Sequence, residues 1–152
     1  ETLFNWLAQD VPQAKCLDLF AGSGGLGFEA ASRQADKVTM IELNPTAFKQ
    51  LEKNIAALNS DNLTAINSDT LSFLQQAGTP HHVVFIDPPF RKGLLEQTVS
   101  LLESNGWLAN DAMIYIETEK ELALEGIPTN WHLHREKTAG QVSYRLFERQ
   151  QD

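Results

Sequence analysis

The stretch Val83-Val84-Phe85-Ile86-Asp87-Pro88-Pro89-Phe90 joins a predicted buried strand to a stiff polar turn. Four consecutive large apolar residues are typical of a strand that is covered on both faces of a parallel sheet. Each proline fixes φ and lacks an N–H, so carbonyl groups around the turn stay open to a ligand. Ligands of open α/β sheets bind at the carboxyl ends of the strands. The stretch therefore predicts a site of hydrogen-bond acceptors beside an aromatic ring, suited to a planar group that carries an NH2.

Strand and helix patterns alternate on both sides of this stretch. Strands are expected at Lys15–Phe20, Lys37–Glu42, Leu63–Asn67, Val83–Ile86, Ala112–Glu117, Trp131–Lys137 and Gln141–Glu148. Helices are expected over about 1–9, 25–34, 45–58 and 92–103, with a further short helix capped by Ser68 or Asp69, and His81 and His82 are expected in a loop. This order predicts an α/β fold: a Rossmann-like, doubly wound sheet of seven mostly parallel strands, with helices on both faces and a C-terminal antiparallel hairpin. We expect one domain over residues 1–152.

Composition limits the classes of function. The chain has 152 residues, is 42% hydrophobic and carries a net charge of −8, which argues against indiscriminate nucleic-acid binding but leaves room for a local basic face. No apolar run approaches the ~20 residues that span a bilayer, and no signal-peptide pattern is present. The single cysteine, Cys16, is expected in the core and fits a reducing cytoplasm. Because the chain begins at Glu1 inside a helical pattern, we expect it to be a fragment that lacks a preceding segment.

A glycine-rich turn follows the first predicted strand. Gly22, Gly24 and Gly27 fit the pattern G-x-G-x-x-G between a strand and a helix, where backbone N–H groups can approach a ligand closely. This pattern alone also fits a nicotinamide oxidoreductase. Asp18 changes the balance, because a carboxylate before the turn repels a pyrophosphate and pairs with an ammonium group.

Carboxylates also end the other central strands. Glu42 can accept both hydroxyls of a ribose, and Asp69 with the Thr70 N–H can bind an adenine edge, although Asp69 also fits a helix cap and Glu42 a solvated strand end. S-adenosyl-L-methionine has an ammonium, a ribose and an adenine but no phosphate. We therefore predict S-adenosyl-L-methionine as the cofactor. The predicted binding residues are Asp18, Phe20, Gly22, Gly24, Gly27, Glu42, Leu43, Asp69 and Thr70.

These motifs resemble those of class I adenosylmethionine-dependent methyltransferases. The [D/N]-P-P-[F/Y] tetrad belongs to enzymes that methylate amino groups of bases or of glutamine. More narrowly, Glu1–Leu7, Leu17–Gly27 and Asp87–Phe90 look like the bacterial 16S ribosomal RNA guanine-966 N2 methyltransferases. The resemblance implies a monomeric cytoplasmic enzyme whose partner is 16S ribosomal RNA in the small ribosomal subunit, with ribosomal proteins as further contacts. It also implies an Arg-rich N-terminal segment that is absent here.

The tetrad predicts how such a base would be held. Asp87 and the Pro88 carbonyl would accept the two N2–H bonds of a guanine, Pro89 would stiffen the turn, and Phe90 would stack on the flipped base. Arg91, Lys92 and Arg145 are candidates for RNA contacts. His132 and His134 alternate on one strand but lack a further ligand, so no metal site is predicted.

Three alternatives stay open besides the nicotinamide enzyme. DNA adenine-N6 and protein glutamine-N5 methyltransferases use the same tetrad, usually with Asn first and Tyr last. The third is an RNA-binding assembly factor that retains the fold without catalysis.

Overall fold

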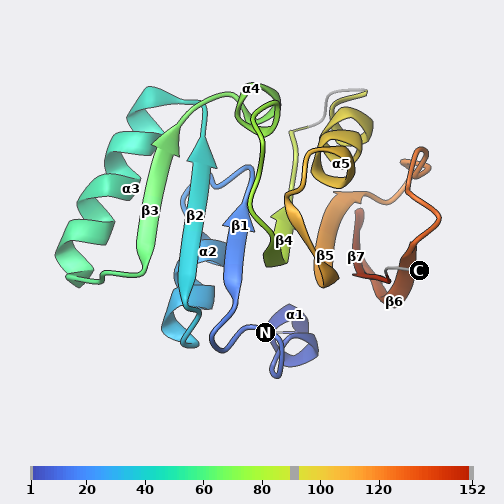
Figure 1. The fold of residues 1–152 in the computed structure, drawn as a ribbon, viewed down its shortest axis with the longest axis horizontal. Coiled ribbons are helices and arrows are strands. Elements are labelled where there is room, and N and C mark those ends of the chain that lie inside the picture. Colours follow the sequence, from blue (N-terminus) through green and yellow to red (C-terminus); the bar gives the residue numbers. More distant parts are fainter. Residues whose placement is uncertain (1, 90–92, 151–152) are drawn as a thin grey trace.

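The computed structural model describes residues 2–89 and 93–150, in which seven strands form one sheet of order β3-β2-β1-β4-β5-β7-β6 (Figure 1). The strands are β1 (Lys15–Asp18), β2 (Lys37–Glu42), β3 (Leu63–Asn67), β4 (His81–Ile86), β5 (Leu108–Glu119), β6 (Trp131–Ala139) and β7 (Val142–Arg149). The helices are α1 (Thr2–Trp6), α2 (Gly25–Ser32), α3 (Pro45–Leu58), α4 (Thr70–Leu74) and α5 (Leu94–Ser104).

The strand order places the predicted site at a switch point of the sheet. Strands β3, β2, β1, β4 and β5 pair in parallel, and β7 pairs antiparallel with both β5 and β6. After β1 the chain moves to one side of the sheet through β2 and β3, and it then returns to the other side at β4. A crevice opens at the carboxyl edge where such a reversal occurs. The predicted fold is therefore confirmed.

Two hydrophobic clusters lie on opposite faces of the sheet because alternate strand residues point to opposite faces. One cluster joins Phe4 of α1, Ala30 of α2 and Leu51 of α3 to Phe85 of β4. The other joins Leu74 of α4 and three residues of α5 to Val84 and Ile86 of the same strand. Cys16 is buried in the first cluster, as predicted, and burial raises the pKa of its thiol to about 12.

Several predicted boundaries were wrong. Helix α1 ends at Trp6 rather than near residue 9, and β1 ends at Asp18 rather than at Phe20. Strand β5 begins at Leu108 instead of Ala112, where Leu108 pairs with His81 of β4, and it continues to Glu119 because β7 pairs with its C-terminal part.

Strand β4 begins at His81, so the loop predicted for His81 and His82 was also wrong. The His81 N–H donates to the Trp107 carbonyl at 2.9 Å, and its buried imidazole lies 5.9 Å from the Trp107 ring, centroid to centroid. Tertiary packing thus extends the strand beyond its apolar run.

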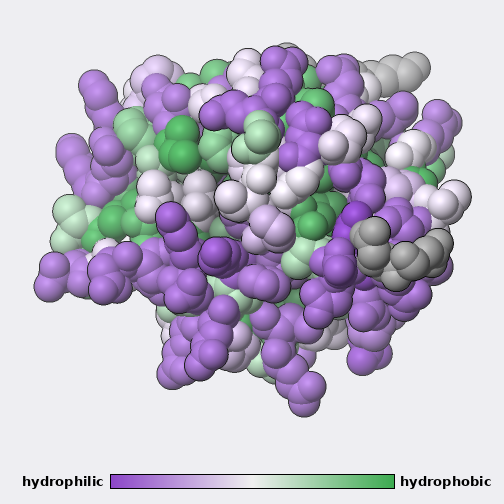
Figure 2. Space-filling model, viewed as in Figure 1, coloured by the Kyte–Doolittle hydropathy of each residue, from purple (hydrophilic) through white to green (hydrophobic). Residues whose placement is uncertain are grey.

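The surface in the view of Figure 1 is mixed. Hydrophilic residues cover the lower half of this face, and hydrophobic residues reach the surface in separate patches over the upper half (Figure 2). Within the described ranges, no helix combines the length and the apolar character that crossing a membrane requires.

Candidate active site

A cleft of about 810 Å³ opens at the carboxyl edge of β1, β2 and β4, and we call it the carboxyl-edge cleft. It brings together residues from four predicted motifs that lie far apart in the sequence. The predicted site residues that line it are Phe20, Gly22, Glu42, Leu43, Asp69, Thr70, Asp87, Pro88 and Pro89. Ser23, Ile41, Asn44, Pro45 and Leu94 also line it and were not predicted.

Two backbone N–H groups fix the Glu42 carboxylate in this cleft. The Gly22 N–H donates to Oε1 at 2.7 Å, and the Asn44 N–H donates to Oε2 at 2.9 Å. Gly22 makes its bond from a left-handed backbone with φ +57°, which favours glycine. Each carboxylate oxygen has a second lone pair, so Glu42 can accept two further hydrogen bonds, as the two hydroxyls of a ribose require.

The other two predicted glycines pack α2 against its neighbours and do not line the cleft. A Cβ at Gly27 would lie 2.6 Å from Met40 Sδ, and one at Gly24 would lie 2.5 Å from a ring carbon of Phe28. The close approach at Gly27 is between α2 and the sheet, and the close approach at Gly24 is to side chains of α2 and α3. Among the three predicted glycines, the structure therefore places Gly22 alone at the cleft.

Asp18 lies beneath the cleft floor and not among its lining residues. Its side chain is 2% exposed, and its Oδ2 atom is buried without a hydrogen-bond partner among the described residues. Burial raises the pKa of Asp18 to about 7; the Gly27 and Phe20 N–H groups oppose this shift, and the Asp87 and Glu42 carboxylates add to it. An unpartnered buried carboxylate oxygen fits a cationic donor such as an ammonium group.

Asp69 caps α4 and also lines the cleft. Its Oδ2 atom accepts from the Ser72 N–H at 3.0 Å, so the predicted helix cap is present. The cap uses one carboxylate oxygen, which leaves the other suited to an amino group. Thr70 is buried, and its hydroxyl donates to the Leu19 carbonyl, which ties the start of α4 to the chain after β1.

Asp87 stands at the end of β4 with Pro88 and Pro89 beside it. Solvent reaches its side chain, but the cleft walls displace part of the surrounding water. This desolvation, with the nearby negative charge of Glu117, raises the pKa of Asp87 to about 6. Asp87 can therefore change its protonation state near neutral pH, as a general base in a cleft must.

The charged side chains of the cleft all carry the same sign. Glu42, Asp69 and Asp87 line it, Asp18 lies below it, and no Lys, Arg or His is among its described lining residues. Such a site attracts a sulfonium or an ammonium and repels a pyrophosphate. The cleft thus favours S-adenosyl-L-methionine over a nicotinamide dinucleotide.

Phe90, Arg91 and Lys92 lie outside the described residues, so their predicted roles stay predictions. Arg145 is described, and its side chain is 17% exposed. Its Nε atom donates to Glu136 Oε2 at 2.8 Å, so this guanidinium already holds a protein partner. No group of three His, Cys, Asp or Glu side chains in residues 2–89 and 93–150 is placed to hold a metal ion.

Sequence reasoning missed Glu117. It lies near the carboxyl end of β5, and its carboxylate is close enough to Asp87 to raise that residue's pKa. The rule that selected Asp18, Glu42, Asp69 and Asp87, a carboxylate where a strand ends, also selects Glu117 at the predicted end of the fifth strand. The signal was present in the sequence.

The fold and this cleft define a Rossmann-like methyltransferase. The family described as "Conserved hypothetical protein 95" matches residues 1–148, and the chain belongs to that family. It is similar to ribosomal RNA small subunit methyltransferase D of Escherichia coli (58% identity over 99% of this chain and 76% of that protein) and of Haemophilus influenzae (53% over 97% and 78%).

Solved structures agree with these sequence comparisons. The structure of the Escherichia coli protein yhhF matches this chain with a TM-score of 0.97 and 57% identity. The match covers 99% of this chain and 85% of the yhhF chain. A structure from Haemophilus influenzae matches this chain with a TM-score of 0.91 and 51% identity. The match covers 99% of this chain and 95% of the Haemophilus influenzae chain.

Proposed function

We propose that this chain methylates the exocyclic N2 of a guanine in 16S ribosomal RNA, using S-adenosyl-L-methionine, and that it acts as a monomer in the bacterial cytoplasm. The observation that carries the proposal is the placement of Asp87, Pro88, Glu42 and Asp69 in one cleft that is lined by acidic side chains. The relatives named ribosomal RNA small subunit methyltransferase D supply the substrate class.

Six residues would hold the methyl donor. Glu42 would accept the ribose hydroxyls, and Asp69 with the Thr70 N–H would bind the adenine edge. Asp18 would receive the positive charge of the amino acid through its unpartnered oxygen. Phe20 and Leu43 would cover the adenosyl group, since both line the cleft and Leu43 is 59% exposed without it.

Asp87 and Pro88 would prepare the guanine amine. When bound, S-adenosyl-L-methionine supplies an electrophilic methyl carbon on a sulfonium. Asp87 and the Pro88 carbonyl accept the two N2–H bonds, which turns the N2 lone pair toward that carbon. Methyl transfer to N2 would leave a cationic nitrogen, which Asp87 would stabilise and from which it would take the proton. Phe90 would stack on the flipped base.

Basic residues beside the tetrad would bind the RNA. Arg91 and Lys92 follow the tetrad directly in sequence and would contact phosphates of the small subunit, with ribosomal proteins as additional partners. Arg145 would contribute less, because its guanidinium is mostly buried against Glu136.

A parallel transfer assay tests the proposal. Radiolabelled S-adenosyl-L-methionine is offered with small ribosomal subunits that lack the modification, with DNA, and with a release factor as the glutamine substrate. We expect label in the ribosomal RNA fraction. Label in DNA or protein instead would support the alternative enzymes, and saturable cofactor binding without any transfer would support a non-catalytic assembly factor.

A further inference from the structure

Glu117 is the residue next to Asp87 across the sheet. In the parallel register of β4 and β5, Phe85 pairs with Tyr115 and Ile86 pairs with Ile116. Asp87 follows Ile86 directly after the end of β4, Glu117 follows Ile116 within β5, and neighbouring strands lie about 4.8 Å apart. The effect of the Glu117 charge on the Asp87 pKa agrees with this short separation.

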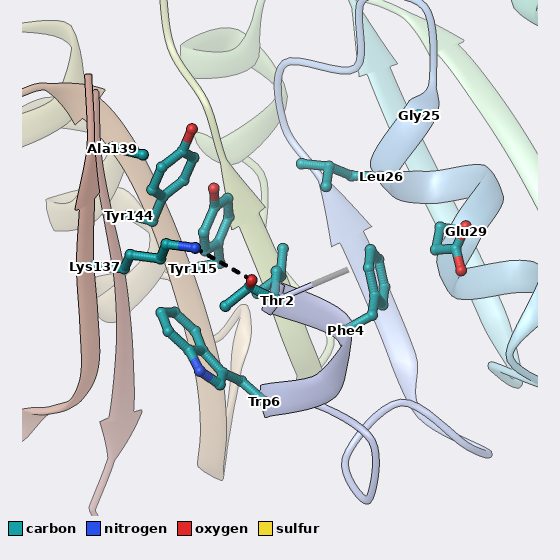
Figure 3. A pocket seen from close by; sticks show the side chains of 11 residues that line it. Thr2, Phe4, Trp6, Gly25, Leu26, Glu29, Tyr115, Lys137, Ala139 and Tyr144 are labelled. Atoms are coloured by element: carbon teal, nitrogen blue, oxygen red, sulfur yellow. Dashed lines mark hydrogen bonds between the residues drawn. The ribbon is translucent and has the colours of Figure 1, made fainter. Parts of the chain in front are cut away.

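Tyr115 holds one side of the Glu117 carboxylate. Its hydroxyl donates to Glu117 Oε1 at 2.7 Å, and its buried ring meets Phe85 edge-on with centroids 6.4 Å apart. Figure 3 shows Tyr115 with its hydroxyl directed away from Trp6. Because Oε1 is fixed by a buried tyrosine, the carboxylate has a set orientation and Oε2 remains for another donor.

Glu117 lines a second cavity that adjoins the carboxyl-edge cleft. This cavity has a volume of about 370 Å³, and we call it the β5 cavity. Pro88 and Pro89 line both the β5 cavity and the carboxyl-edge cleft, so the two spaces meet at the tetrad. Leu95 and the partly exposed Leu122 give the β5 cavity apolar walls, as the faces of a nucleobase require.

We propose that Glu117 selects guanine by accepting a hydrogen bond from N1–H while Asp87 and Pro88 hold the N2 amine. The inference rests on the proposed function and deepens it by naming what distinguishes the base. Guanine presents N1–H and N2–H side by side on one edge, which matches two carboxylates side by side on adjacent strands. Adenine presents an N1 lone pair in the corresponding position, and a carboxylate repels it. The preference for guanine over adenine then comes both from the hydrogen bond to guanine N1–H and from the repulsion of the adenine N1 lone pair.

The test replaces the target guanine with 2-aminopurine, which keeps the 2-amine and has an unprotonated N1. Small subunits are reconstituted with RNA that carries either base at the position that the wild-type enzyme methylates, and single-turnover rates are compared. The wild type should prefer guanine by about 100-fold or more. Glu117→Gln provides an amide NH2 that can donate to the unprotonated N1, so its preference should fall to within about tenfold. Comparing ratios between enzymes cancels the intrinsic reactivity of the two amines.

Glu119→Gln is the matched control, because Glu119 lines the same cavity two residues further along β5. Its preference should equal that of the wild type. Tyr115→Phe removes the hydroxyl that fixes Oε1 and should lower the preference by a smaller factor than Glu117→Gln does. The melting temperature and the affinity for S-adenosylhomocysteine, expected to be unchanged in Glu117→Gln, report folding and cofactor binding separately.

The possible outcomes separate this inference from the proposed function. A wild type that methylates guanine while Glu117→Gln and Tyr115→Phe keep the wild-type ratio overturns the role of Glu117 alone. A wild type that leaves guanine unmethylated in every substrate overturns the proposed function, and the inference with it.

Discussion

Asp87 combines three properties at the scale of a single residue: a place at the end of β4, a carboxylate neighbour, and a pKa raised to about 6 by desolvation and by Glu117. The ionised form is the one that accepts N2–H bonds and a proton. Since the raised pKa leaves the group protonated below about 6, the single-turnover rate should fall about tenfold per pH unit under that value and level off above pH 7. A rate that is constant from pH 5 to 8 would contradict the assignment.

Substitution of Asp87 gives a second prediction for the same residue. Asp87→Ala should lower the transfer rate by about 10³-fold or more, because positioning and proton acceptance are lost together. The affinity for S-adenosylhomocysteine, measured by calorimetry, should change only modestly. Substantial turnover by the variant would show that another group accepts the proton.

We expect Asp18 to lower the stability of the protein without ligand and to contribute to ligand binding. Its pKa is 3.8 in the unfolded chain and about 7 when folded, so this carboxyl lowers the free energy of unfolding as the pH rises through that range. Asp18→Asn should therefore stabilise the protein without ligand by about 1–2 kcal/mol at pH 8, with the gain shrinking as the pH falls from 7 toward 4 and absent below about pH 4. Urea titrations at several pH values measure this difference.

The ligand response of Asp18→Asn is the complementary measurement. S-adenosylhomocysteine should raise the melting temperature of the wild type more than that of the variant, because the amide has no negative charge for the ammonium. An equal rise in both proteins would show that Asp18 has no part in binding.

At the scale of elements, α2 and the sheet approach so closely that the methyl group of an alanine at Gly27 would not fit between them. A Cβ at Gly27 would lie 2.6 Å from Sδ and 2.8 Å from Cγ of Met40, which is fully buried. Gly27→Ala should lower the free energy of unfolding by about 1–3 kcal/mol. Gly25→Ala on the same helix is the control, since nothing lies within 4 Å of its added Cβ. Equal stability of both variants would contradict this packing argument.

Elements differ in how far the sequence predicts them. The apolar runs of β2 and of the core of β4 are visible because burial on both faces requires them, and the glycine turn marks the start of α2. The beginning of β4 at His81 could not be predicted, because a polar residue joins the strand through its contact with Trp107. The extension of β5 likewise depends on tertiary pairing, with His81 of β4 at its beginning and with β7 at its end.

A charged cluster joins the β6–β7 hairpin to α5, and it gives a further prediction at the scale of elements. Arg149 contacts both oxygens of Glu103 at 2.9 Å, and the Trp131 indole N–H donates to the same carboxylate at 2.7 Å. These bonds, chiefly that from Arg149, lower the pKa of Glu103. Glu103→Gln should lower the free energy of unfolding by about 1–2 kcal/mol at pH 7, with the loss shrinking as the pH falls below 4.5.

The control for Glu103→Gln is a more exposed ion pair. Glu29→Gln breaks a pair in which both side chains are at least 39% exposed, so it should change stability by less than about 0.5 kcal/mol. Urea titration measures the free energy of unfolding of both variants. Equal losses of this free energy would show that the hairpin cluster stabilises the protein no more than an exposed ion pair does.

At the scale of the whole molecule, the sheet assembles a site from residues that the sequence keeps far apart. The positions of Gly22, Glu42, Asp69 and Asp87 in one cleft follow from the rule that parallel strands end at one edge, so they could be predicted. The packing roles of Gly24 and Gly27 and the burial of Asp18 could not, because they depend on the neighbouring side chains Phe28 and Met40 and on the depth of the floor. Glu117 was within reach of the same rule.

We expect this molecule to place a methyl group on N2 of a guanine in small-subunit RNA. Small subunits that lack the modification are incubated with the protein and S-adenosyl-L-methionine, and their RNA is digested to nucleosides for mass spectrometry. We expect one N2-methylguanosine to be added per subunit by the wild type and none by Asp87→Ala. Methylation at adenine N6, or at a guanine atom other than N2, would contradict it.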